Sequence, residues 1–88
     1  MSPYSWLFER AALLAAMQFV PRDQRHVVDA VEFLARNPFQ SGQLHYLDAD
    51  GKAIQVYFAD HIAVHYSVDH AVRAVRIVSL EENLPSDP

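Results

Sequence analysis

Histidine is the residue type in this chain with the clearest potential for chemistry. Five of the 88 residues are histidine, and imidazole titrates near neutral pH and binds transition metals. His61 and His65 would align on a helix, but on a strand the same spacing separates them by about 13 Å. Their segment has a strand pattern, and His26 and His45 have no visible partner. We therefore expect no metal and no cofactor.

A second candidate is a histidine beside an arginine on the outward face of the last two predicted strands. A two-residue turn at Asp69-His70 would place Ala63 opposite Arg76, with His65 diagonally beside that arginine, whereas a turn one residue longer would bring Arg73 there instead. Histidine with arginine can perform acid–base chemistry on a phosphodiester. An exposed cross-strand polar pair without a catalytic role is the more common meaning of this pattern.

Composition excludes several other classes of site. The chain has no cysteine, so it has no disulfide, no cysteine-bound metal and no thiol nucleophile. It also lacks a Gly-rich phosphate loop, a nucleophile elbow and a zinc motif. The net charge of −4 disfavours indiscriminate binding to nucleic acid.

The second half of the chain supplies the elements that must position these side chains. Turn signals at residues 48–51, 59–60 and 69–70 separate four β-prone segments, which are residues 43–47, 52–58, 61–68 and 72–80. In the third segment, alternation assigns Tyr66 to the core and His65 to the outward side. Gly51 suits the left-handed position of the first turn.

Two helices are predicted before this sheet. The first covers residues 4–19 after a Ser2-Pro3 start signal, and it is apolar almost all round, so it needs cover from its own domain or from a second subunit. The second covers residues 21–36 and is stopped by Asn37-Pro38. The expected oligomer interface on the first helix consists of Trp6, Leu7, Leu14 and Met17.

These elements define one small α+β domain at residues 1–80, with two N-terminal helices packed on a four-stranded antiparallel meander. Residues 81–88 read as an acidic flexible tail. The apolar stretch at residues 13–17 is far shorter than the roughly 20 residues that span a bilayer. We therefore expect a soluble, cytoplasmic protein with no membrane partner.

Three segments of the chain carry a likeness to known proteins. Residues 21–38 read PRDQRHVVDAVEFLARNP, residues 62–69 read IAVHYSVD and residues 72–78 read VRAVRIV. In order and spacing they resemble the RelE/ParE superfamily of bacterial toxin–antitoxin toxins, over about residues 21–80. Members usually begin with a strand, whereas here residues 3–8 continue into the helical pattern, so that strand is expected to be short or absent.

The resemblance implies a toxin fold and a cognate antitoxin as partner. Superfamily members cleave mRNA on the ribosome or poison gyrase, and cleavage relies on arginine and lysine, often with a tyrosine or histidine near the C-terminus. This sequence departs from that set, since Ala63 stands where relatives commonly carry arginine, and Glu81 and Glu82 follow the last predicted strand. Carboxylates there repel a phosphate backbone, so the sequence favours protein binding over enzymatic action and disfavours RNA or ribosome contact.

We therefore expect a RelE/ParE-like toxin or toxin relative that binds an antitoxin and a cellular target. The expected binding surface consists of Tyr57, His61, His65, Arg73 and Arg76. One alternative is a metal-independent endoribonuclease that uses His65 with Arg73 or Arg76 as catalytic residues. Another is a degenerate module without toxicity that forms a homodimer through the first helix.

Overall fold

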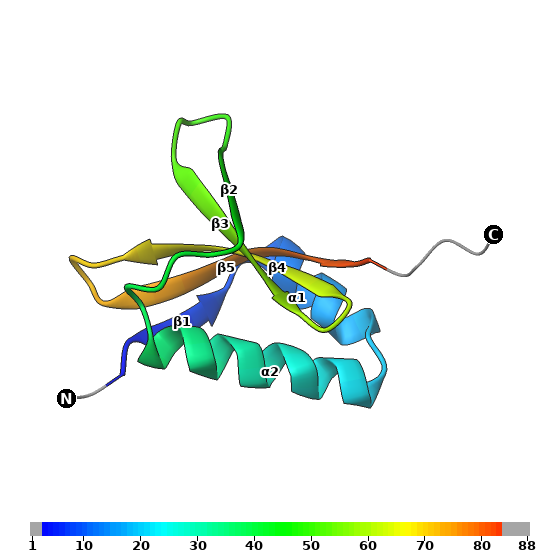
Figure 1. The fold of residues 1–88 in the computed structure, drawn as a ribbon. Helices are drawn as coiled ribbons and strands as arrows, with labels where there is room; N and C mark the ends of the chain where they lie inside the picture. Colours follow the sequence, from blue (N-terminus) through cyan, green and yellow to red (C-terminus); the bar gives the residue numbers. More distant parts are fainter. Residues whose placement is uncertain (1–2, 84–88) are drawn as a thin grey trace.

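The computed structural model describes residues 3–83, which form two helices packed on one face of a five-stranded sheet (Figure 1). In the sheet, the strand order is β1-β5-β4-β3-β2, with β1 parallel to β5 and all other neighbours antiparallel. The predicted α+β class is confirmed, and the sheet has one strand more than predicted. The elements in chain order are β1 (Ser5–Phe8), α1 (Arg10–Gln18), α2 (Pro21–Arg36), β2 (Leu44–Leu47), β3 (Ala53–Ala59), β4 (Ile62–Asp69) and β5 (Ala74–Glu82).

The additional strand, β1, comes from the segment that the sequence assigned to the first helix. Both of its ends are anchored, because the Tyr4 amide donates to the Ala35 carbonyl and the Glu9 amide donates to the Ile77 carbonyl, each at 2.9 Å. Large aromatic side chains suit a strand, and pairing with β5 overrides the helical pattern. The helix prediction is wrong before Arg10, and Ser2 of the predicted start signal lies outside the described residues.

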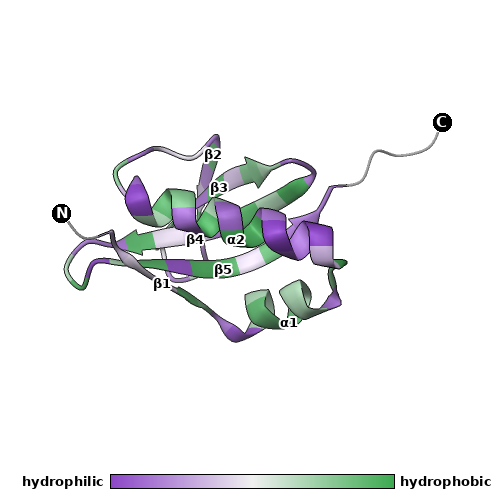
Figure 2. Cartoon of the chain, turned by 90° about the horizontal axis from the view of Figure 1, so that it is seen from below, coloured by the Kyte–Doolittle hydropathy of each residue, from purple (hydrophilic) through white to green (hydrophobic). Residues whose placement is uncertain are grey.

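This correction divides the predicted oligomer surface between two elements. Trp6 and Leu7 lie in β1 and not on the first helix, whereas Leu14 and Met17 lie in α1. Figure 2 shows that α1 is apolar along most of its length. No helix within residues 3–83 is long and apolar enough to cross a membrane.

Helix α2 occupies the residues predicted for it. It begins at Pro21, whose missing N–H costs nothing in a first turn, and it ends at Arg36. Polar and apolar residues alternate along it in Figure 2, and the apolar stripe faces the sheet. The core combines side chains of α2 with the facing side chains of β4 and β5, namely Val27, Ala30, Val31, Leu34, Ile62, Val64, Tyr66, Val75, Ile77 and Leu80.

The hairpin turns set a register that differs from the predicted one. Gly51 has the expected left-handed conformation, with φ of 77°. Between β4 and β5, Asp69 pairs with Ala74, so the loop covers residues 70–73 and is longer than either predicted turn. A β-bulge between His65 and Tyr66 shifts the register again.

As a result, Ala63 faces Glu81, and Arg76 faces Ser67. The predicted pairing of Ala63 with Arg76 is therefore wrong, and so is the alternative that places Arg73 there. Strand β5 extends to Glu82, so Glu81 and Glu82 belong to the sheet. Most of the predicted tail, residues 84–88, lies outside the described residues.

The face of the sheet that points away from the helices, which we call the open face, carries its own apolar layer. Ile54 and Val56 of β3 are only 1% and 4% exposed although no helix covers them. Their neighbours on β2 lie on the same face, where Tyr46 pairs with Ile54 and Leu44 pairs with Val56. The β2–β3 hairpin bends away from the helices in Figure 1.

Candidate functional site

On the open face, the imidazole of His65 lies between two polar partners. Its Nδ1 lies 2.9 Å from the Tyr46 hydroxyl oxygen, and its Nε2 lies 2.7 Å from Glu81 Oε1. Which ring nitrogen carries the proton depends on the tautomer of His65. We call Tyr46, His65 and Glu81 the open-face site.

Three strands bring the open-face site together. Tyr46 lies on β2, His65 on β4 and Glu81 on β5. The β-bulge and the long β4–β5 loop decide which β5 residue approaches His65, because Glu81 faces Ala63, two residues before the histidine. The sequence placed His65 on the outward side correctly, but it missed Tyr46 and Glu81 because neither the bulge nor the loop length has a sequence signal.

The surroundings of Tyr46 favour its neutral form. Burial raises the pKa of the Tyr46 phenol above its ordinary value, and the negative charges of Glu81 and Asp48 raise it further. Tyr46 therefore keeps its phenolic proton at neutral pH. A tyrosine, a histidine and a carboxylate linked in this order can move a proton toward or away from a bound group.

A groove of about 420 Å³ lies beside the open-face site. Most of its wall is apolar, with Leu44, Val56 and Phe58 on one side, and Glu81 is the charged side chain that lines it. Such a groove suits an apolar or hydrogen-bonding group better than a phosphate, which the carboxylate repels.

The cations of the open face lie in a neighbouring depression of about 290 Å³. Lys52 and Arg76 line it together with Ser67 and the acidic residue Asp69. Arg76 lies on the same face as His65, as predicted. The two side chains have different partners, because Arg76 Nε lies 3.6 Å from Glu9 Oε2 and His65 Nε2 lies 2.7 Å from Glu81 Oε1. Arg73 lies outside both depressions, in the β4–β5 loop with φ of 54°.

The other two residues of the predicted binding surface lie on the helix side of the sheet. Tyr57 stacks on Phe33 of α2, with ring centroids 5.5 Å apart. His61 lies in the β3–β4 turn and contacts Asp23 of α2. The five predicted binding residues therefore do not form one surface.

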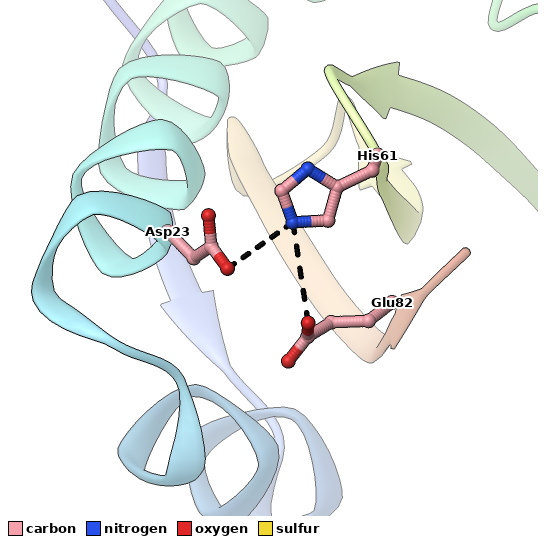
Figure 3. A group of neighbouring side chains, drawn as sticks. All are labelled: Asp23, His61 and Glu82. Carbon is pink, nitrogen blue, oxygen red and sulfur yellow. Dashed lines mark hydrogen bonds and ion pairs between the residues drawn. The ribbon is translucent and has the colours of Figure 1, made fainter. Parts of the chain in front are cut away.

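His61 belongs to a second polar cluster, the helix-side cluster, with Asp23 and Glu82 (Figure 3). Its Nε2 lies 3.1 Å from Asp23 Oδ2 and 3.9 Å from Glu82 Oε2, and its Nδ1 lies 2.9 Å from Asp60 Oδ2. The hydrogen bond to Asp60, and then the one to Asp23, raise the pKa of His61. The same bond to His61 lowers the pKa of Asp60.

The residues of the predicted oligomer surface are exposed. Trp6 and Leu7 are each 43% exposed, Leu14 is 49% exposed and Met17 is 63% exposed. The single residue that α1 buries fully is Ala12. Leu7 pairs with Arg76 and lies on the open face, whereas Trp6 pairs with Val75 and lies on the helix side. We call the exposed residues Trp6, Leu14 and Met17, without Leu7, the apolar surface of β1 and α1.

Comparison with solved structures defines the class of fold as that of RelE-type toxins. One match is the toxin–antitoxin complex RelBE2 (Rv2865-2866) from Mycobacterium tuberculosis, with a TM-score of 0.75, 20% identity, and coverage of 92% of this chain and 99% of that chain. Another is the archaeal RelE-RelB complex from Pyrococcus horikoshii OT3, with a TM-score of 0.75, 13% identity, and coverage of 97% and 100%. No family model and no curated protein sequence matches the chain.

Proposed function

We propose that this chain is the toxin of a toxin–antitoxin module, that it acts in the cytoplasm, and that it works by binding an antitoxin and a cellular target. The observation that carries the proposal is the shared fold, with a TM-score of 0.75 over 92% of this chain and 99% of the RelBE2 chain. A partial match would show only a common substructure. Here the whole RelE-type domain is matched, and the matched structures are the toxin–antitoxin complex RelBE2 and a RelE-RelB complex.

The apolar surface of β1 and α1 supports a protein partner. Monomeric soluble proteins rarely expose large apolar patches unless a partner covers them. Leu14 and Met17 point to solvent from a helix of nine residues, and Trp6 adds an exposed apolar side chain on the helix side of β1. An amphipathic antitoxin helix has the chemistry to cover this surface.

A growth assay with the neighbouring open reading frame tests the proposal. Induced expression of the chain should stop growth, and coexpression of the neighbour's product should restore it. Leu14→Glu should prevent the rescue, because a charge at the centre of the apolar surface weakens the antitoxin contact. Absence of toxicity, together with absence of binding by the neighbour's product, would contradict the proposal.

Val28→Glu is the matched control for the rescue experiment. Val28 is 42% exposed, close to the 49% of Leu14, but it lies on α2 and outside the apolar surface of β1 and α1. Rescue should therefore survive this substitution. Rescue that survives Leu14→Glu would place the antitoxin contact elsewhere.

Metal-independent endoribonuclease action is a second candidate function, and the open-face site favours it. His65, held between Tyr46 and Glu81, has the geometry for proton transfer. Lys52 and Arg76 in the neighbouring depression supply positive charge for a phosphate. The charge of Glu81 in the groove weighs against an RNA substrate, so we place this function second.

An mRNA cleavage assay in a translation extract decides this second candidate. His65→Gln and Arg76→Ala should each abolish cleavage, whereas Arg73→Ala should leave it intact because Arg73 lies in the β4–β5 loop. Cleavage that is unchanged by His65→Gln would remove the open-face site from consideration.

A further inference from the structure

The helix-side cluster joins three elements that are distant in sequence. Asp23 comes from the first turn of α2, His61 from the β3–β4 turn and Glu82 from the end of β5. One ligand atom of each residue lies within 4.8 Å of the others. Figure 3 shows Asp23 and Glu82 directed at the same imidazole nitrogen, Nε2 of His61.

The hydrogen bonding of Asp23 is incomplete. This residue is only 4% exposed, and its Oδ1 has no hydrogen-bond partner. The nitrogen beside that oxygen is His26 Nδ1 at 3.8 Å, which is too long for a hydrogen bond and is itself buried without a partner. A buried carboxylate and a buried imidazole nitrogen are costly when left unsatisfied.

Charge in the cluster is also unbalanced. Three carboxylates, those of Asp23, Asp60 and Glu82, lie within 4.0 Å of His61 nitrogens. A proton on His61 supplies one positive charge against three negative ones, and the second imidazole near them, that of His26, lies 3.8 Å from Asp23 and 3.9 Å from Asp60. Within residues 3–83 no lysine or arginine forms an ion pair with these carboxylates, so a divalent cation would balance the cluster better than a proton.

We propose that Asp23, His61 and Glu82 bind a divalent transition metal of the zinc class. Zinc–ligand bonds of about 2.1 Å place tetrahedral ligand atoms about 3.4 Å apart. The distances from His61 Nε2 to Asp23 and Glu82, 3.1 and 3.9 Å, lie on either side of that value. One imidazole with carboxylates favours zinc over calcium or magnesium, which take oxygen ligands.

The contact made by the second imidazole nitrogen of His61, Nδ1, is also typical of a metal-binding histidine. Metal-bound histidines usually donate their second N–H to a carboxylate, which fixes the ring and its tautomer. Asp60 Oδ2 lies 2.9 Å from His61 Nδ1 and takes this role. His26 Nδ1 lies 3.8 Å from Oδ1, the other oxygen of Asp23.

The expectation of no metal came from the spacing of histidines along one strand. That spacing still separates His61 from His65, but it says nothing about Asp23, which is 38 residues from His61 in sequence. A metal here would join the start of α2 to the end of β5. It would thereby hold the strand end that presents Glu81 to His65.

Isothermal titration of the untagged, chelator-treated protein with zinc chloride tests the proposal. We expect one equivalent to bind, and Asp23→Asn, His61→Gln and Glu82→Gln each to weaken the affinity at least tenfold. Magnesium and calcium chloride should show no binding. Glu82→Gln is the decisive variant should the other two fail to fold, because the Glu82 side chain is 33% exposed at a strand end.

His45→Gln is the matched control, since His45 is an exposed histidine on β2, outside the cluster. This variant should bind zinc as the unmodified protein does. The proposal is overturned if the unmodified protein binds no zinc, if folded Glu82→Gln binds it with full affinity, or if His45→Gln loses it. These outcomes do not depend on toxicity, so they are separate from the test of the proposed function.

Discussion

Tyr46 and Glu81 give His65 two different chemical partners. Nε2 lies 2.7 Å from a carboxylate oxygen, and Nδ1 lies 2.9 Å from a phenol oxygen. Because both ring nitrogens contact protein oxygens, a bound group reaches the imidazole only when Tyr46 or Glu81 moves aside. These two side chains therefore limit access to His65.

The titration of Tyr46 gives a prediction about pH. Its pKa is raised above the ordinary 10.0 by burial and then by Glu81 and Asp48. The folded state holds this proton more tightly than the unfolded state, so the associated stability is complete below about pH 10 and is lost as the pH rises through the folded pKa. The phenolate absorbance of the wild type minus that of Tyr46→Phe should show a midpoint above 10.

Removing the neighbouring charge checks the cause of that shift. Glu81→Gln should lower the midpoint of the Tyr46 titration, because an uncharged amide does not repel a phenolate. An unchanged midpoint would show that Glu81 does not act on Tyr46. The Tyr46→Phe difference also excludes the titration of Tyr66, whose pKa is raised by burial as well.

Two leucines with different surroundings test the assignment of core and surface. Leu34 is 1% exposed in the core, and Leu14 is 49% exposed on α1. Leu34→Ala should lower the free energy of unfolding by about 2–5 kcal/mol, whereas Leu14→Ala should change it by less than about 0.5 kcal/mol. Urea denaturation measures both, and similar losses would contradict the assignment.

At the scale of elements, the two glycines provide a matched pair. Gly51 has φ of 77° with open space where a Cβ would lie, so alanine there meets only backbone strain. Gly51→Ala should cost about 1 kcal/mol. In Gly42→Ala the new Cβ would lie 2.8 Å from the Val56 carbonyl oxygen, so this variant should cost more than Gly51→Ala in the same denaturation assay.

Elements with strong local signals were predictable from the sequence. Both ends of α2 follow from Pro21 and Asn37-Pro38, and Tyr66 is buried as its strand pattern indicates. Strand β1 was not predictable, because its residues also suit a helix and only pairing with β5 decides between the two. The bulge after His65 likewise depends on contacts between strands.

In the open-face site and the helix-side cluster, the residues that the sequence did not predict are those whose position depends on other elements. His65 was a candidate because its own strand places it outward. Its partners Tyr46 and Glu81 are fixed by the register of two other strands. The helix-side cluster requires the packing of α2 against the sheet, which no periodicity in the sequence specifies.

For the whole molecule, the main question is what covers the apolar surface of β1 and α1. A chain of 88 residues buries a limited core, and here several large apolar side chains stay outside it. An antitoxin is the partner that we propose for this surface. A second copy of the chain is the alternative in the absence of that antitoxin.

Light scattering at micromolar concentration distinguishes these states. The free wild-type protein should be a homodimer, because pairing two copies removes Trp6, Leu14 and Met17 from water, at roughly 25 cal/mol per Å² of apolar area. Combined Leu14→Glu and Met17→Glu substitutions should give a monomer, and Val28→Glu should stay dimeric. A wild type that is strictly monomeric would rule out self-association and would leave the antitoxin as the proposed occupant of the surface.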